Sequence, residues 1–210
     1  MQNPVRGFLH GGAAVLSAVG LGFLVARTWG EGGRLIGAIA FGVSLVAMYT
    51  VSALFHSIPW REAAKRWMQR VDHSMIFLLV AGTMTPIAIV ILDGWLLALD
   101  LAVVWGIAIV GITLKLTLRS PLTWLSVTLQ LLMGWSAVAW FPTLLAEAGW
   151  SVTWPVIAGG LAYTVGVVFY ATQRPLLFPR VFSAHELFHV LVVTASTLHW
   201  VAIWRVVGVA

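Results

Sequence analysis

The sequence predicts an all-α integral membrane protein with seven transmembrane helices. Of its 210 residues, 60% are hydrophobic and only 9% are charged, and the mean hydropathy is +0.97. Because so few polar residues are available to cover a water-facing surface, the chain is expected to fold in lipid. Its length accommodates about seven spans of ~20 residues with short loops, so we expect a single seven-helix domain over residues 1–210.

Seven apolar runs, separated by charged or turn-forming residues, define the expected spans. They cover residues 8–27, 35–56, 72–92, 95–114, 122–141, 152–171 and 183–204. Pro59 ends the second run, Asp93-Gly94 forms the turn after the third, and Pro142 is expected to end the fifth and lead into a loop that contains Glu147. The charged stretch 61–70 is expected to form a short, separate helix at the membrane interface.

The distribution of Lys and Arg predicts the orientation of the chain. Nine of these residues lie in the N-terminal segment and in the loops after the second, fourth and sixth runs, and three lie on the other side. The positive-inside rule therefore places the N-terminus in the cytoplasm and the C-terminus outside, in the inner (plasma) membrane of the cell. The net charge of +5 follows this membrane pattern, so no nucleic-acid partner is expected.

Five polar residues fall at the ends of three runs that the predicted topology brings to one side of the membrane. His185 and His189 are spaced i, i+4 and therefore share one helix face. His56 ends the second run, with Ser52 one turn before it, and Asp72 opens the third run. We therefore expect these side chains to meet at the same membrane depth.

The chemistry of this set is that of a catalytic metal site. Three imidazoles and one open position are typical of catalytic zinc (Zn2+), which generates a nucleophile from water near pH 7. The chain has no Cys, so thiolate ligands, thiol nucleophiles and disulfides are excluded. The sequence predicts that His56, His185 and His189 bind zinc. Asp72 is predicted to accept a proton from the water, and Ser52 to donate to the water or to a developing oxyanion.

The remaining polar residues of the runs receive weaker assignments. His10 lies on the same side as the predicted site and is expected near it. His73 points about 100° away from Asp72 on a helix and is interpreted as structural. His199 lies about 15 Å beyond His189 along the helix axis, too far to share the metal. Asp100 lies on the outer side, where no role follows from the sequence.

Four motifs together resemble those of the hemolysin III family, the bacterial branch of the progestin and adipoQ receptors, which is more distantly related to the alkaline ceramidases. The motifs are Ser52-x-x-x-His56, Asp72-His73-Ser74-x-Ile76-Phe77, Gly82-Thr-x-Thr85-Pro86 and His185-Glu-x-Phe188-His189. The resemblance covers essentially the whole chain. It implies a seven-helix membrane fold, zinc held by the three His residues named above, and Ser52 and Asp72 beside the metal water.

The resemblance also implies an activity, because the relatives hydrolyse lipid amides, notably ceramides. A membrane lipid is therefore the expected substrate, and hydrolysis of its amide or ester bond is the expected reaction. The chain departs from the family in two places. Asn3 precedes His10 at an unusual spacing without the usual acidic residue, and Phe55 stands where Tyr commonly precedes the His of the second span. The first departure leaves the role of the N-terminal segment open.

Two other interpretations fit parts of the sequence. His185-Glu186-Leu-Phe-His189 matches the H-E-x-x-H pattern of zinc proteases with Glu186 as the base, although Asp93, which resembles a second metalloprotease motif, lies on the opposite side. Alternatively, the protein is a receptor, a pore-former or a regulator of membrane homeostasis with a structural zinc, closed by Asp72 as a fourth ligand. The bacterial branch is also named for haemolytic activity, which these residues do not explain. No oligomeric state follows from the sequence.

The topology is testable with reporter fusions. A reporter fused within residues 61–70 is expected to be cytoplasmic, because this stretch carries four of the positive charges that set the orientation. A fusion at Asp93-Gly94 serves as the control and is expected outside. An external signal from residues 61–70 would overturn both the orientation and the convergence of the five polar residues on the cytoplasmic side.

Overall fold

The structure is a computed structural model that describes residues 4–118, 123–178 and 181–209. Within these ranges the regular structure is helical, and the only β-type pairing is an isolated bridge between Phe178 and Phe182. The helices are α1 (Pro4–Arg27), α2 (Gly32–Ser57), α3 (Glu62–Ile91), α4 (Gly94–Thr117), α5 (Thr123–Trp135), a 3-10 helix η1 (Ser136–Trp140), α6 (Phe141–Ala148), α7 (Trp150–Thr172) and α8 (Ala184–Val206).

Seven of the described segments are long and apolar enough to cross a membrane. α5, η1 and α6 together make one of them, Trp124–Ala148, and the other six are single helices. This confirms the predicted all-α fold class and its seven transmembrane helices. Many large apolar side chains are exposed on the outside of the bundle, among them Phe8, Leu16 and Trp95, as expected for a surface that contacts lipid. The protein is therefore a multi-pass membrane protein.

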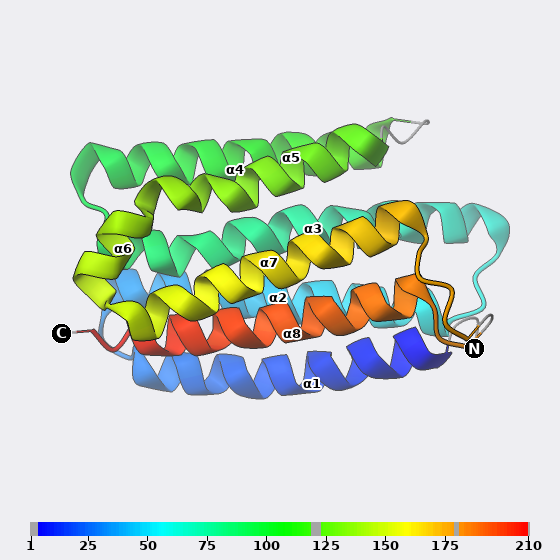
Figure 1. Cartoon of the computed structure of the whole chain (residues 1–210), viewed down its shortest axis with the longest axis horizontal. Helices are drawn as coiled ribbons and strands as arrows, with labels where there is room; N and C mark the ends of the chain where they lie inside the picture. The colour runs from blue at the N-terminus through cyan, green and yellow to red at the C-terminus, as the bar shows by residue number, and fades with distance from the viewer. Residues whose placement is uncertain (1–3, 119–122, 179–180, 210) are drawn as a thin grey trace.

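The helices lie side by side along the long axis of the molecule (Figure 1). α8 lies between α1 and α7, and the most extensive interfaces join α7 to α8, α1 to α2 and α2 to α3. We call the end of the bundle that holds the start of α1, the end of α2 and the starts of α3 and α8 the histidine end. The C-terminus lies at the opposite end (Figure 1). The orientation of the two ends across the membrane stays a prediction.

The prediction of a separate interfacial helix over residues 61–70 is wrong. This stretch forms the first turns of α3, which continues without a break to Ile91. The reason is local: residues 62–70 contain no Gly or Pro and several strong helix formers, and Glu62 pairs with Arg66 one turn later at 3.9 Å. Asp72 therefore lies in the third turn of a long helix instead of at the start of one.

The predicted end of the fifth span is also wrong. The chain continues past Phe141 into α6, and Glu147 lies in this helix instead of in a loop. Pro142 lies in the first turn of α6, where its missing N–H removes no intrahelical hydrogen bond. The actual break follows at Gly149, whose φ of +72° suits glycine, and α7 begins directly after it.

Close packing of α2 against α3 aligns the polar residues of the site. Gly82 in α3 lies directly against α2, so that a Cβ atom there would be 2.8 Å from the backbone oxygen of Ala40 and would also collide with Ser44. Small residues permit such close helix contacts in membranes. Because the two helices are antiparallel, this contact places Ser52 of α2 at the same level as Asp72 of α3.

A methyl group at Gly82 is expected to destabilise the bundle. In Gly82→Ala the new Cβ would meet backbone atoms that cannot rotate away, and overpacking of this kind costs about 1–3 kcal/mol. The measurement is the melting temperature of purified protein in detergent. Gly22→Ala is the matched control, because a Cβ at Gly22 has no neighbour within 4 Å. Equal melting temperatures for the two variants would contradict the role of this contact.

Candidate metal centre

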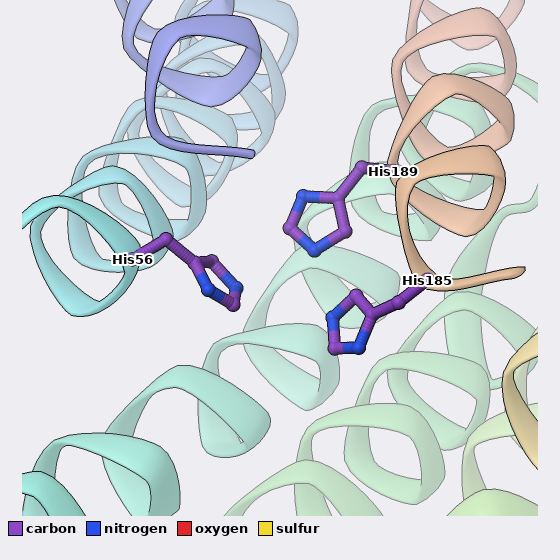
Figure 2. Close-up of side chains that lie close together, drawn as sticks. All are labelled: His56, His185 and His189. Atoms are coloured by element: carbon purple, nitrogen blue, oxygen red, sulfur yellow. The ribbon is translucent and has the colours of Figure 1, made fainter. Parts of the chain in front are cut away.

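Three histidines from two helices meet at the histidine end of the bundle. His56 lies in the last turn of α2, and His185 and His189 lie in the first turns of α8. Each offers a ring nitrogen, and these nitrogens lie within 4.8 Å of one another. The centroid of the His56 ring lies 5.5 Å from that of the His185 ring and 4.9 Å from that of the His189 ring. Figure 2 shows the three side chains pointing toward one another.

The hydrogen bonding of these rings fits a metal. His56 and His189 are only 3% and 2% exposed, yet Nε2 of His56 and Nδ1 of His189 have no hydrogen-bond partner among the described residues. A buried polar atom without a partner costs about 1–3 kcal/mol, whereas a divalent cation uses the lone pair of a neutral imidazole. Three imidazoles with converging nitrogens and no thiolate suit zinc and related borderline metals. The three His residues could therefore bind a metal.

Ser52 and Asp72 lie beside this group without joining it. The Ser52 hydroxyl interacts with the Asp72 carboxyl group, which links α2 to α3. Both residues line a cavity of about 180 Å³ together with His185 and His189. Within the described part of the chain, the group of mutually close metal-binding atoms contains the three imidazoles and no carboxylate. Asp72 therefore faces the same space as the metal-binding rings from a separate position.

His10 is placed next to the three histidines. It is 2% exposed, and its ring lies 4.0 Å from the ring of His189 and 4.9 Å from that of Tyr49, measured between centroids. Neither of its ring nitrogens has a hydrogen-bond partner in the described ranges. Tyr49 in turn donates a hydrogen bond of 2.8 Å to Ser196 of α8. His10 thus packs the start of α1 against His189.

Glu186 is engaged in contacts that hold two helices together. Nε of Arg6 in α1 donates a 2.7 Å hydrogen bond to Oε1 of Glu186, and the backbone N–H of Ser183 donates a 2.9 Å bond to Oε2. The second contact is that of a capping residue in the first turn of a helix. Both carboxylate oxygens are therefore occupied, which argues against Glu186 as the free base of a protease. Asp93 precedes α4 at the opposite end of the bundle.

The other polar residues of the spans have separate partners. Nε2–H of His199 donates to the carbonyl oxygen of Val156 at 3.2 Å, away from the three histidines. Asp100 accepts a 2.9 Å hydrogen bond from the indole of Trp140. His73, which the sequence marks as structural, also lines the cavity.

Two further cavity residues are not predicted from the sequence. Tyr170 at the end of α7 lies with its ring 5.5 Å from the ring of His185. Lys115 in the last turn of α4 lines the same cavity. A signal for Lys115 was present, because a single Lys stands in a long apolar run. In the sequence, however, Lys115 is equally consistent with one of the positive charges that set the membrane orientation, so its position in the cavity cannot be recognised.

Comparison with known proteins identifies the relatives of the chain. The family described as Haemolysin-III related matches residues 1–200. The chain belongs to the haemolysin III family. This confirms the resemblance drawn from the four motifs.

The relatives come from bacteria and from mammals. Hemolysin-3 homolog of Bacillus subtilis (strain 168) is 33% identical over 178 residues, which cover 82% of this chain and 82% of that protein. Hemolysin-3 of Bacillus cereus is 31% identical over 202 residues, 94% of this chain and 88% of that protein. The human monocyte to macrophage differentiation factor is 25% identical over 182 residues, 81% and 70% of the two chains. Proteins of differing names are thus similar in sequence to most of this chain.

Loss of one imidazole is expected to abolish metal binding. Purified protein should contain about one equivalent of metal, and His185→Ala should lose most of it, because two imidazoles hold a divalent ion far less tightly than three. Elemental analysis by mass spectrometry measures the content. His199→Ala is the control and is expected to keep its metal, since this ring contacts Val156 instead. Full metal retention by His185→Ala would count decisively against the site.

Proposed function

We propose that this haemolysin III protein is a zinc-dependent hydrolase of a lipid amide or ester. The observation that carries the proposal is a cavity that Ser52 and Asp72 line together with His185 and His189 of the three-His group, and whose other walls are mainly apolar. A structural site would need no neighbouring carboxyl and hydroxyl pair. Mainly apolar walls suit the acyl chain of a lipid.

Zinc is the proposed metal, held by His56, His185 and His189. When bound, zinc acts as a Lewis acid toward carbonyl oxygens and lowers the pKa of water to near 7. Three protein ligands leave room for a further ligand, as in catalytic zinc sites. The absence of a carboxylate from the three-His group, within the described residues, favours this open arrangement over a structural site closed by Asp72.

The proton transfers are assigned to the carboxyl group of Asp72. Its carboxylate oxygens would accept a proton from the attacking water and deliver it to the nitrogen or oxygen of the leaving group. The Ser52 hydroxyl, which interacts with that carboxyl group, would hold it in position, or would turn its single O–H toward the carbonyl oxygen of the substrate as charge develops there. Such a pair needs both residues at one depth, and the α2–α3 contact provides that alignment.

The cavity would bind the acyl chain and exclude bulk water. Its walls come mainly from α3, α5, α7 and α8, and include Leu79, Met84, Ile157 and Val192. An acyl chain that enters from the bilayer would exchange contacts with lipid for dispersion contacts with these side chains. We place the protein in the inner (plasma) membrane, where a lipid substrate can enter from the bilayer.

Removal of the Asp72 charge is expected to lower turnover without releasing the metal. Zinc-loaded protein and Asp72→Asn are incubated with a mixed lipid extract, and released fatty acid is measured by mass spectrometry. Because general acid–base catalysis contributes about 10²–10⁴-fold, release should fall at least about a hundredfold. Zinc content should stay near that of the unaltered protein.

The comparison with Glu186→Gln separates the proposal from a protease. Glu186 binds Arg6 and Ser183, so its variant should retain lipid hydrolysis when folded. Loss of activity in Glu186→Gln together with full activity in Asp72→Asn would support a protease. No release by any of the proteins, across many lipid classes, would favour a receptor, pore or regulator with a structural zinc.

A further inference from the structure

Lys115 is a buried lysine in the wall of the cavity. The chain has two lysines, and the other, Lys65, lies outside the cavity in the first turns of α3. Lys115 is 6% exposed although it lies in the last turn of α4, where a Lys side chain can usually extend to the membrane surface. Its side chain instead lines the space that Asp72 and His185 share.

None of the acidic side chains forms an ion pair with Lys115 in the described ranges. The acidic residues of the chain are Glu31, Glu62, Asp72, Asp93, Asp100, Glu147 and Glu186, and all of them lie in these ranges. Three of them pair with arginines. Asp100 accepts from Trp140, and Asp72 interacts with Ser52. Asp93 and Glu147 lie at the opposite end of the bundle.

An unpaired cation at this position needs a reason. A charged side chain within a membrane protein is costly unless it meets an opposite charge or water, and such residues mark ligand or ion pathways. A positive charge in the last turn of a helix gains about 0.3–1 kcal/mol from the helix dipole. That interaction explains a Lys at the end of α4, but it does not explain why the side chain is buried against the cavity.

Lys115 and His185 line the same cavity, and His73 and Tyr170 link them through a series of pairwise interactions. Lys115 is close enough to His73 to interact with it electrostatically. The ring of His73 lies 6.2 Å from that of Tyr170, and the ring of Tyr170 lies 5.5 Å from that of His185. All four residues line the cavity. A molecule that fills this cavity can therefore contact both His185 and Lys115.

We propose that Lys115 binds the anionic group of an amphiphile whose apolar chain occupies the cavity. A carboxylate and a phosphate share the required chemistry, because each accepts charge-assisted hydrogen bonds from an ammonium group. His73 would contribute a further N–H donor beside Lys115. The inference rests on the proposed function, since it names the class of substrate for the same cavity: a lipid with a negative charge near its scissile bond.

The test compares amphiphiles that differ only in their head group. Laurate, dodecyl phosphate and dodecanol carry chains of equal length, and their affinities for the full-length, metal-loaded protein in neutral detergent are measured by calorimetry. The two anions should bind about tenfold or more tightly than dodecanol, the lower range of a hydrogen bond to a charged group. The tighter of the two anions assigns the head group as carboxylate or phosphate.

Substitutions of the two lysines assign the preference to Lys115. Lys115→Met should bind the two anions about tenfold or more weakly than the unaltered protein does, with its affinity for dodecanol unchanged, while Lys115→Arg should retain the anion preference. Lys65→Met, the matched control, should behave like the unaltered protein. Retention of the full preference in Lys115→Met, or its absence from the unaltered protein, would overturn the proposal.

A measurement on the unaltered protein tests the same proposal if a Lys115 variant fails to fold. Laurate should slow the acylation of Lys115 by an amine-reactive reagent, as followed by peptide mass spectrometry, and leave Lys65 unaffected. Equal rates at Lys115 with and without laurate would refute the anion site.

Binding and hydrolysis fail separately in this design. An anion preference that is lost in Lys115→Met, in a protein that hydrolyses no lipid, would support the anion site and refute the proposed function. Hydrolysis of neutral lipids without any anion preference would support the proposed function and refute the anion site. His185→Ala should lose turnover and keep the anion preference, because Lys115 lies on α4 and is not a metal ligand.

Discussion

The site depends on one constraint, which is that the backbone of a chain in lipid must satisfy its own hydrogen bonds. Every span is therefore helical, and polar side chains can meet only where helices place them at a common depth. His56 reaches His185 and His189 because α2 ends where α8 begins. The close contact at Gly82 then sets the level of Asp72 against Ser52. The remaining helices supply the apolar walls around this meeting point.

The sequence predicts the parts of this arrangement that follow from periodicity and topology. The i, i+4 spacing determines that His185 and His189 share a face, and alternation of the spans brings His56 to the same end. The sequence does not predict that α3 is continuous, because a charged stretch can form either an interfacial helix or the start of a span. Pro142 is equally ambiguous, since proline suits both the end of one helix and the first turn of the next.

Cavity residues were harder to predict for a different reason. Tyr170 and Lys115 lie near the ends of α7 and α4, where aromatic and basic residues commonly contact the membrane interface. Only the packing of the neighbouring helices shows that they line the cavity. The names of the relatives do not identify a function either, because hemolysin-3 and a mammalian differentiation factor are both similar in sequence to this chain. Function is therefore best argued from the cavity and its side chains.

The length of α3 has a consequence for how the centre is supplied. Its 30 residues span roughly 45 Å, while the hydrocarbon layer is only about 30 Å thick, so the helix protrudes from the bilayer or tilts within it. Asp72 lies roughly 15 Å from the first residue of α3, so it lies close to the boundary between the two solvents when the excess length protrudes at this end. In the proposed hydrolysis, ions and water would then arrive from the aqueous phase and acyl chains from the bilayer, and neither would have to cross the other's medium.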